Sequence, residues 1–178
     1  RLFTKRLTDR AVAFIKKNKD KPFFLYVPHI MPHVPIFASD SFRGKSARGL
    51  YGDVIEEIDW SVGEIVKTID RLSLTENTLV IFTNDNGPFL SYGTHAGQSG
   101  ALRGGKLTTF EGGVRVPMVA RWPGQIPAGH TCSTPIISID LLPTFCYLAH
   151  APLPEKTIDG VNITDILLGK SDTVENRD

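Results

Sequence analysis

Apolar residues recur every three or four positions in two long stretches of the chain, as in helices that bury one face. The first stretch covers residues 4–19, carries basic residues on its other face and ends before Pro22. The second covers residues 50–73. A shorter helix is predicted over 138–150, interrupted early by Pro143. The periodic positions are Leu7, Ala11, Phe14 and Ile15 in the first helix and Val54, Ile58, Val62, Ile65, Ile69 and Leu72 in the second.

Three short apolar runs lie among these helices and have the length and composition of strands. They cover residues 23–27, 78–83 and 116–122, and Pro117 moves the third to a sheet edge or to a later start. Helices that alternate with strands predict an open α/β sheet. Ligands of such sheets usually bind beyond the carboxyl ends of the strands.

Polar loops follow the first two of these strands. Residues 28–49 form a long loop rich in Pro, His, Ser and Gly, and residues 84–88 form a tight turn. We therefore expect both loops to face one crevice at the sheet edge. A glycine-rich stretch covers 93–113, and no clear element is predicted from residue 152 onward.

Composition narrows the possible classes of protein. Of 178 residues, 41% are hydrophobic and 22% charged, as in a folded globular domain. A net charge of +1 gives no sign of a nucleic-acid-binding surface, and no apolar run approaches the ~20 residues that span a membrane. Two cysteines, Cys132 and Cys146, exclude a disulfide framework and leave their own pairing open. The chain begins at Arg1 without a signal peptide, so we expect a piece of a longer protein.

Asp85 and Asn86 are the first candidates for chemistry because they place two oxygen donors at a strand end. A calcium ion takes about six to eight oxygen ligands, so two residues cannot complete a site. From the dipeptide alone, a turn that uses Gly87 is the favoured interpretation.

His29 and His33 are four residues apart, which is the spacing of a zinc-binding pair on a helix. The surrounding prolines exclude a helix, and no Glu follows His29, so a metalloprotease site is excluded. Either histidine could act as an acid or base, or the loop could be a rigid surface segment.

The segment from Gly100 to Leu107 nearly matches a phosphate-binding P-loop. Leu107 replaces the Ser or Thr that holds magnesium, and no buried strand directly precedes Gly100, so nucleotide binding is rejected. Lys106 beside a glycine-rich loop could still neutralise an oxyanion, or could be a solvated lysine.

Two other polar features carry weaker predictions. His95 could line a pocket or cap a loop. Asp53, Glu56 and Glu57 lie mostly off the apolar stripe of the second long helix, and a solvated acidic face is the favoured interpretation.

Short motifs follow one another along nearly the whole chain. They are Pro22-Phe-Phe-Leu-Tyr26, Pro32-His33-Val-Pro35, Gly49-Leu-Tyr-Gly-Asp53, Asp59-Trp-Ser-Val-Gly63, Thr83-Asn-Asp85-Asn86-Gly87-Pro88, Leu102-Arg-Gly-Gly-Lys106, Glu111-Gly-Gly-Val-Arg-Val-Pro117, Ser138-Ile-Asp-Leu-Leu-Pro143-Thr and Asp159-Gly-Val. Any one of them is weak, but the ordered set resembles sulfatases of the arylsulfatase type.

The resemblance implies an α/β fold, the alkaline-phosphatase-like mixed sheet flanked by helices. Residues 1–178 would be the second half of the catalytic domain, approaching a smaller C-terminal domain from about residue 152. The family hydrolyses sulfate esters with a formylglycine, made from the Cys or Ser of a Cys/Ser-x-Pro-x-Arg motif, and with one bound calcium ion.

Individual roles also follow from the resemblance. Asp85 and Asn86 would be two calcium ligands, and Lys106 would bind a sulfate oxygen. His33 would contact the sulfate and protonate the leaving alkoxide or phenoxide. His95 and Arg103 are candidate residues of the substrate pocket.

The chain departs from the family pattern in three respects. Neither Cys132 nor Cys146 lies in a Cys-x-Pro-x-Arg motif, and no Ser supplies the alternative. The remaining calcium ligands, which are two Asp, and the Lys and His that follow the formylglycine are also missing. We therefore expect an absent N-terminal half to supply them, and residues 1–178 alone to be inactive. Leu107 stands where a small residue is common, beside Lys106.

Two alternatives stay open: a phosphoester or phosphonate hydrolase of the same superfamily, and a non-catalytic sulfatase-like binding module. Phosphatase-like relatives commonly have Asp-His-Gly where this chain has Asp85-Asn86-Gly87, so Asn86 favours a sulfatase. The expected partners are a sulfated small molecule or glycan and the rest of the same polypeptide. Secretion, or a periplasmic or lysosomal location, is expected from the resemblance alone.

Overall fold

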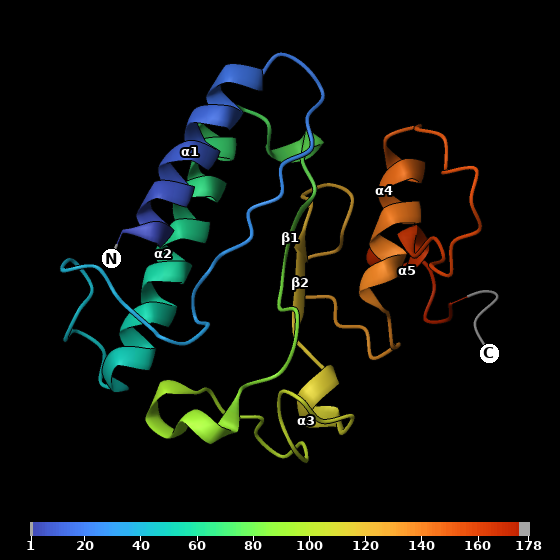
Figure 1. The fold of residues 1–178 in the computed structure, drawn as a ribbon. Coiled ribbons are helices and arrows are strands. Elements are labelled where there is room, and N and C mark those ends of the chain that lie inside the picture. Colours follow the sequence, from blue (N-terminus) through green and yellow to red (C-terminus); the bar gives the residue numbers. More distant parts are fainter. Residues whose placement is uncertain (1, 175–178) are drawn as a thin grey trace. The chain divides into compact units, whose positions relative to one another are not determined.

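A computed structural model describes residues 2–174 (Figure 1). The chain divides into two compact units, with residues up to 119 in the first and residues from 120 onward in the second. The boundary falls inside strand β2, Met118–Arg121. No helix among the described residues is long and apolar enough to cross a membrane.

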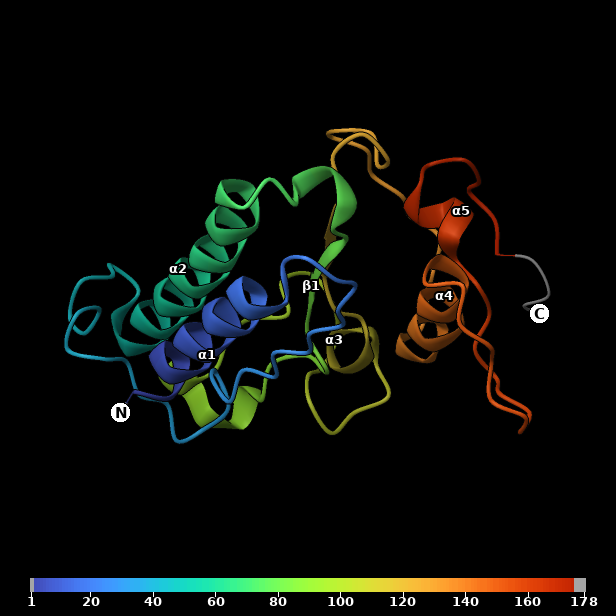
Figure 2. The same ribbon diagram turned by 90° about the horizontal axis from the view of Figure 1, so that it is seen from above.

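Two long helices, α1 (Phe3–Asn18) and α2 (Gly49–Arg71), lie side by side in the first unit (Figures 1 and 2). Both confirm the predicted helices to within two residues. The predicted apolar face of α1 was partly wrong, because Phe14 is exposed and Leu7 only half-buried. The residues that α1 buries are Thr4, Thr8, Ala11 and Ile15.

Hydrogen bonding explains why threonines occupy the buried face of α1. The Thr8 hydroxyl donates to the Thr4 carbonyl over 2.8 Å and is hydrogen-bonded to the hydroxyl of Ser61 on α2 over 2.6 Å. A buried hydroxyl with such partners avoids the cost of losing water. Phe14 packs edge-on against Phe23 instead, with ring centroids 5.9 Å apart.

Strand β1 (Val80–Thr83) and β2 form a two-stranded sheet. Directly after Pro117, β2 begins, which confirms the later start that the proline predicted. The strand predicted over 23–27 was wrong: these residues form no regular element, and Phe24 and Tyr26 are 70% and 76% exposed. A strand pairs with a neighbouring strand of a sheet, and the sheet found among the described residues consists of β1 and β2.

The loop between α1 and α2 packs onto α2 through apolar residues. Met31, Ile36 and Ala38 form a buried cluster with Val54 and Ile58. These contacts hold the long loop against one face of the helix pair. The 28–49 loop was predicted correctly, and it extends to residue 48.

The predicted solvated acidic face of α2 was wrong for Asp53 and Glu57, which are buried, whereas Glu56 is exposed. The Asp53 carboxylate accepts three backbone N–H groups of residues 44–46, over 2.8 to 3.0 Å. The Glu57 carboxylate accepts the Ser39 N–H over 2.8 Å. These carboxylates tie the loop to α2, because backbone donors replace the water that they lose on folding.

Replacing Asp53 with asparagine is expected to destabilise the full-length protein most above about pH 4. Hydrogen bonds from the Ser46 and Gly44 N–H groups hold the pKa of Asp53 below its usual range. A lowered pKa in the folded state gives stability that is present above the unfolded pKa and is lost as pH falls through the folded pKa. Thermal unfolding of Asp53→Asn and wild type from pH 2 to pH 7 tests this. A difference in Tm that did not shrink at low pH would contradict it.

The second unit is organised around Asp140, at the end of the short helix η3 (Ser138–Asp140). Its carboxylate accepts the N–H groups of Ile137 and Val161, over 2.8 and 3.0 Å. The helix α4 (Leu141–Leu148) follows η3 directly and carries Pro143 in its first turn, where a proline is tolerated. Together, η3 and α4 confirm the helix predicted over 138–150.

One further helix of the second unit, α5 (Thr164–Leu167), lies in the region where the sequence predicted no clear element, from residue 152 onward. That prediction was wrong. The four residues of α5 are too few for periodicity to reveal. The remaining short helices are η1 (Thr75–Asn77), η2 (Leu90–His95) and α3 (Glu111–Val114).

Candidate active site

Asp85 and Asn86 lie in the turn directly after β1, as the sequence predicts. The Asp85 Oδ1 atom accepts the Asn86 N–H over 3.0 Å, so the turn is closed by its own side chain. Asp85 is exposed and Asn86 half-buried. The turn and the oxygen-donor interpretations are therefore compatible, because Oδ1 has further lone pairs and Oδ2 is a second acceptor.

The glycine-rich loop docks onto this turn through its backbone. The Lys106 N–H donates to the Pro88 carbonyl over 2.9 Å, and the Gly87 N–H donates to the Gly113 carbonyl over 2.9 Å. The backbone of Lys106 is thus hydrogen-bonded to Pro88, the second residue after Asn86. Two polar clusters 20 residues apart in sequence belong to one local structure.

Glycine at position 105 permits this docking. A Cβ atom there would overlap the Pro88 carbonyl oxygen and press on the Leu90 side chain. Leu107, next to Lys106, has a φ of 75° and is 82% exposed. The left-handed conformation favours glycine, so leucine carries a conformational cost at this position.

Replacing Gly105 with alanine is expected to destabilise the full-length protein by about 1–3 kcal/mol, because the new methyl group forces the two segments apart. Gly63→Ala is the matched control, since a Cβ at Gly63 meets nothing within 4 Å in the interior of α2. That control is expected to stabilise by about 0.5–1 kcal/mol. Denaturant unfolding of both variants tests this, and equal effects on stability would contradict it.

His33 is exposed on the loop that precedes α2. Its Nδ1 atom lies 2.8 Å from the Val34 carbonyl oxygen. A carbonyl only accepts hydrogen bonds, so Nδ1 carries a proton and Nε2 is the nitrogen open to a ligand. Among residues 2–174, no hydrogen bond joins His33 to Asp85, Asn86 or Lys106, and the shared crevice stays a prediction.

His95 and Arg103 lie within the glycine-rich stretch of residues 93–113. His95 is exposed at the end of η2. The Arg103 guanidinium lies over the Phe110 ring, 3.7 Å from its centroid, and the Arg103 carbonyl accepts the Gly112 N–H over 2.8 Å. Arg103 is thus held by a cation–π contact, and both residues stay candidates for the substrate pocket.

The donor set in the described part of the chain is incomplete for a metal. No group of three or more His, Cys, Asp or Glu residues there could hold an ion. Asp85 and Asn86 supply hard oxygen donors, which suit calcium, but only a fraction of the six to eight that it takes. The pair therefore fits calcium as part of a larger ligand set.

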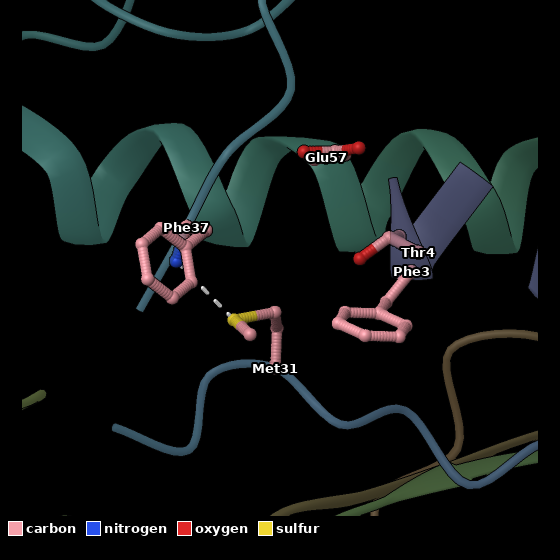
Figure 3. Close-up of a pocket in the computed structure, with 5 residues that line it drawn as sticks. All are labelled: Phe3, Thr4, Met31, Phe37 and Glu57. Carbon is pink, nitrogen blue, oxygen red and sulfur yellow. Dashed lines mark hydrogen bonds between the residues drawn. The ribbon is translucent and has the colours of Figure 1, made fainter. Parts of the chain in front are cut away.

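One small pocket lies between α1, α2 and the preceding loop (Figure 3). Phe3, Thr4, Met31, Phe37 and Glu57 line it, and about 10 Å³ is open to the centre of a water molecule. This is space for about one water and is far below the size of a substrate pocket. None of the candidate site residues lines it.

Comparison with known proteins identifies related chains. The family model described as Sulfatase matches residues 1–151. Steryl-sulfatase of Homo sapiens is 44% identical over 94% of this chain and 30% of its own length. Arylsulfatase A of Homo sapiens is 48% identical over 86% of this chain and 30% of its own length. The chain thus spans about 30% of these curated relatives.

Solved structures show the same similarity. Ps i-CgsB in complex with k-i-k-neocarrahexaose has a TM-score of 0.85 and 36% identity over 95% of this chain and 39% of its own. The PsFucS1 sulfatase from Pseudoalteromonas sp. has a TM-score of 0.87 and 34% identity over 94% of this chain and 34% of its own. The phosphonate monoester hydrolase SpPMH from Silicibacter pomeroyi has a TM-score of 0.58 and 24% identity over 74% of this chain and 24% of its own, which shows a similar fold alone.

Proposed function

This chain belongs to the sulfatase family and has part of the alkaline-phosphatase-like α/β fold of its solved neighbours, and from this premise we propose that the full-length protein hydrolyses sulfate esters. The observation that carries the proposal is the docking of the Lys106 loop onto the Asp85–Asn86 turn. This contact supports the proposal because the backbone of a cationic residue lies beside a turn that carries two hard oxygen donors, and an anionic ester and a metal require such groups.

Asp85 and Asn86 would hold one side of a calcium ion, with the other ligands supplied by the rest of the polypeptide. Bound calcium would polarise the sulfate oxygens of the substrate. Asp85 is exposed, and its backbone is held in a tight turn. Less conformational entropy would therefore be lost when its carboxylate binds a metal ion.

Lys106 would bind a sulfate oxygen and stabilise the negative charge that develops during the reaction. Its backbone is fixed by the Pro88 carbonyl, and its Nζ atom lies 5.9 Å from the centroid of the Phe89 ring. Lys106 is half-buried and has no carboxylate partner among the described residues. A preorganised cation of this kind lowers the energy of a transition state that gains negative charge.

His33 would protonate the leaving alkoxide or phenoxide. Because Nδ1–H donates to Val34, a proton carried by Nε2 is the one that can be transferred.

The nucleophile is proposed to be a formylglycine in the rest of the polypeptide. Cys132 is exposed and Cys146 half-buried, and neither lies in the required Cys/Ser-x-Pro-x-Arg context. Residues 1–178 by themselves would therefore not hydrolyse sulfate esters. A segment with unpaired strand edges would also tend to aggregate.

The substrate class is proposed to be a sulfated small molecule or glycan. Ps i-CgsB was solved with a neocarrahexaose, and steryl-sulfatase and arylsulfatase A are named for smaller substrates. The secreted, periplasmic or lysosomal location stays a prediction from the family.

The test is hydrolysis of matched 4-nitrophenyl sulfate and 4-nitrophenyl phosphate by the full-length protein, with peptide mapping by mass spectrometry. We expect the sulfate to be hydrolysed with the higher kcat/KM, and a formylglycine peptide in a Cys/Ser-x-Pro-x-Arg context. A preference for the phosphate would favour a phosphoester hydrolase. Hydrolysis of neither ester, without an encoded Cys/Ser-x-Pro-x-Arg, would favour the binding module.

A further inference from the structure

Two histidines of the same loop lie in opposite environments. The His33 side chain is exposed, and its Nδ1 atom lies 2.8 Å from the carbonyl oxygen of the neighbouring Val34. His29 is half-buried, and its Nδ1 atom is buried without a hydrogen-bond partner among the described residues. Burial lowers the pKa of His29, so its ring is neutral at pH 7. A buried polar ring without full hydrogen bonding costs stability, so its presence needs another reason.

The other ring nitrogen of His29 reaches the interface of the two long helices. Its Nε2 atom lies 3.5 Å from the Ser61 Oγ atom, and Ser61 is 0% exposed. Ser61 is itself held by the Thr8 hydroxyl of α1 over 2.6 Å. Three polar side chains are therefore in contact in sequence: Thr8 of α1, Ser61 of α2 and His29 of the loop.

The loop is also attached to α2 two residues after His29, at Met31. Met31 is buried against α2, and its sulfur accepts the Phe37 N–H over 3.4 Å (Figure 3). His33 is thus an exposed residue of a short segment that is attached at positions 29 and 31 and again at Ile36. A side chain held between fixed points loses little freedom when it meets a substrate.

We propose that His29 is a positioning residue for His33, holding its loop through the buried hydroxyl of Ser61. The inference rests on the proposed role of His33 as the proton donor to the leaving group. Loss of a positioning residue can be distinguished from a general loss of packing by its dependence on the leaving group. A misplaced His33 transfers its proton less well, so esters with poor leaving groups are slowed more than esters whose leaving group needs no proton.

The test measures kcat and KM of the full-length protein for phenyl sulfate and 4-nitrophenyl sulfate. His29→Ala and Ser61→Ala are expected to lower kcat about 10- to 100-fold for phenyl sulfate and less than about 3-fold for 4-nitrophenyl sulfate, with little change in KM. In the double variant His29→Ala/His33→Ala, the loss is expected to equal that of His33→Ala alone. His29→Gln, which keeps a polar group near Ser61, should restore part of the rate if His29→Ala folds poorly.

Thr68→Val is the matched control for Ser61→Ala. It removes another buried hydroxyl of α2, one that donates to the Glu64 carbonyl of the same helix over 2.8 Å. It is expected to change stability without changing the ratio of the two kcat values. Equal losses for both esters, or full additivity in the double variant, would overturn the inference alone. A wild-type protein that hydrolyses neither sulfate ester would overturn the proposed function and this inference together.

Discussion

Replacing Lys106 with methionine in the full-length protein is expected to lower kcat for sulfate-ester hydrolysis by about 100- to 1,000-fold, the usual loss for one electrostatic donor to a developing oxyanion. Methionine keeps the apolar stem and removes only the charge and the N–H donors. The backbone N–H of Lys106 stays bonded to Pro88, so the loop should keep its place. The measurement is steady-state kinetics on 4-nitrophenyl sulfate.

Lys17→Met provides the control for this substitution, because Lys17 is an exposed lysine in the last turn of α1. It is expected to leave kcat unchanged within about 2-fold, as exposed surface charges contribute little. If Lys106→Met kept kcat within about 3-fold of wild type, Lys106 would be a solvated lysine. Lys106→Arg separates charge from shape, since a planar guanidinium does not replace a compact ammonium.

Removal of the Asp85 carboxylate is expected to deplete calcium from the full-length protein and to lower kcat/KM by at least about 100-fold, more than the loss of an outer-shell group. Asp85→Ala removes a charged oxygen donor that a hard cation prefers. Metal content measured by mass spectrometry gives a readout that does not depend on activity. Chelation of the wild-type protein and return of calcium should remove and restore the same activity.

Asp59→Ala removes an exposed carboxylate of α2 and serves as the comparison. It is expected to keep both the metal content and the rate of the wild type. An Asp85→Ala protein with full calcium occupancy would mean that this carboxylate only closes the turn after β1. The same result would leave Asn86 without its proposed partner in ligation.

The helices were the most predictable part of the fold. In the predicted apolar stripe of α2, Val54, Ile58 and Ile69 are buried, and the helix ends two residues before the predicted boundary. The other three residues of the stripe are only half-buried: Val62, Ile65 and Leu72. Local periodicity is enough to predict a long helix, because all its backbone hydrogen bonds are made within the segment. Residues 23–27 failed as a strand for the opposite reason, since a strand takes its hydrogen bonds from another segment.

The candidate site was predictable in its residue types but not in its connections. Lys106, Asp85 and Asn86 stood out from the sequence as separate weak signals, and the ordered motifs joined them only by resemblance. The bond from Lys106 N–H to Pro88 shows that the two segments meet. His29 and Ser61 gave no signal of their contact, because they are 32 residues apart and neither fits a motif for interaction.

By itself, the sequence determined where the long helices form, that Pro117 delays a strand and which side chains bear oxygen, imidazole or ammonium groups. These properties depend on neighbours within a few residues, so local order is sufficient to encode them. Only the tertiary structure decided that Asp53 and Glu57 are buried and that Lys106 joins the Asp85 turn. An acidic residue on a helix is solvated unless a distant loop brings backbone N–H groups to it, and that approach is set by the packing of the folded chain.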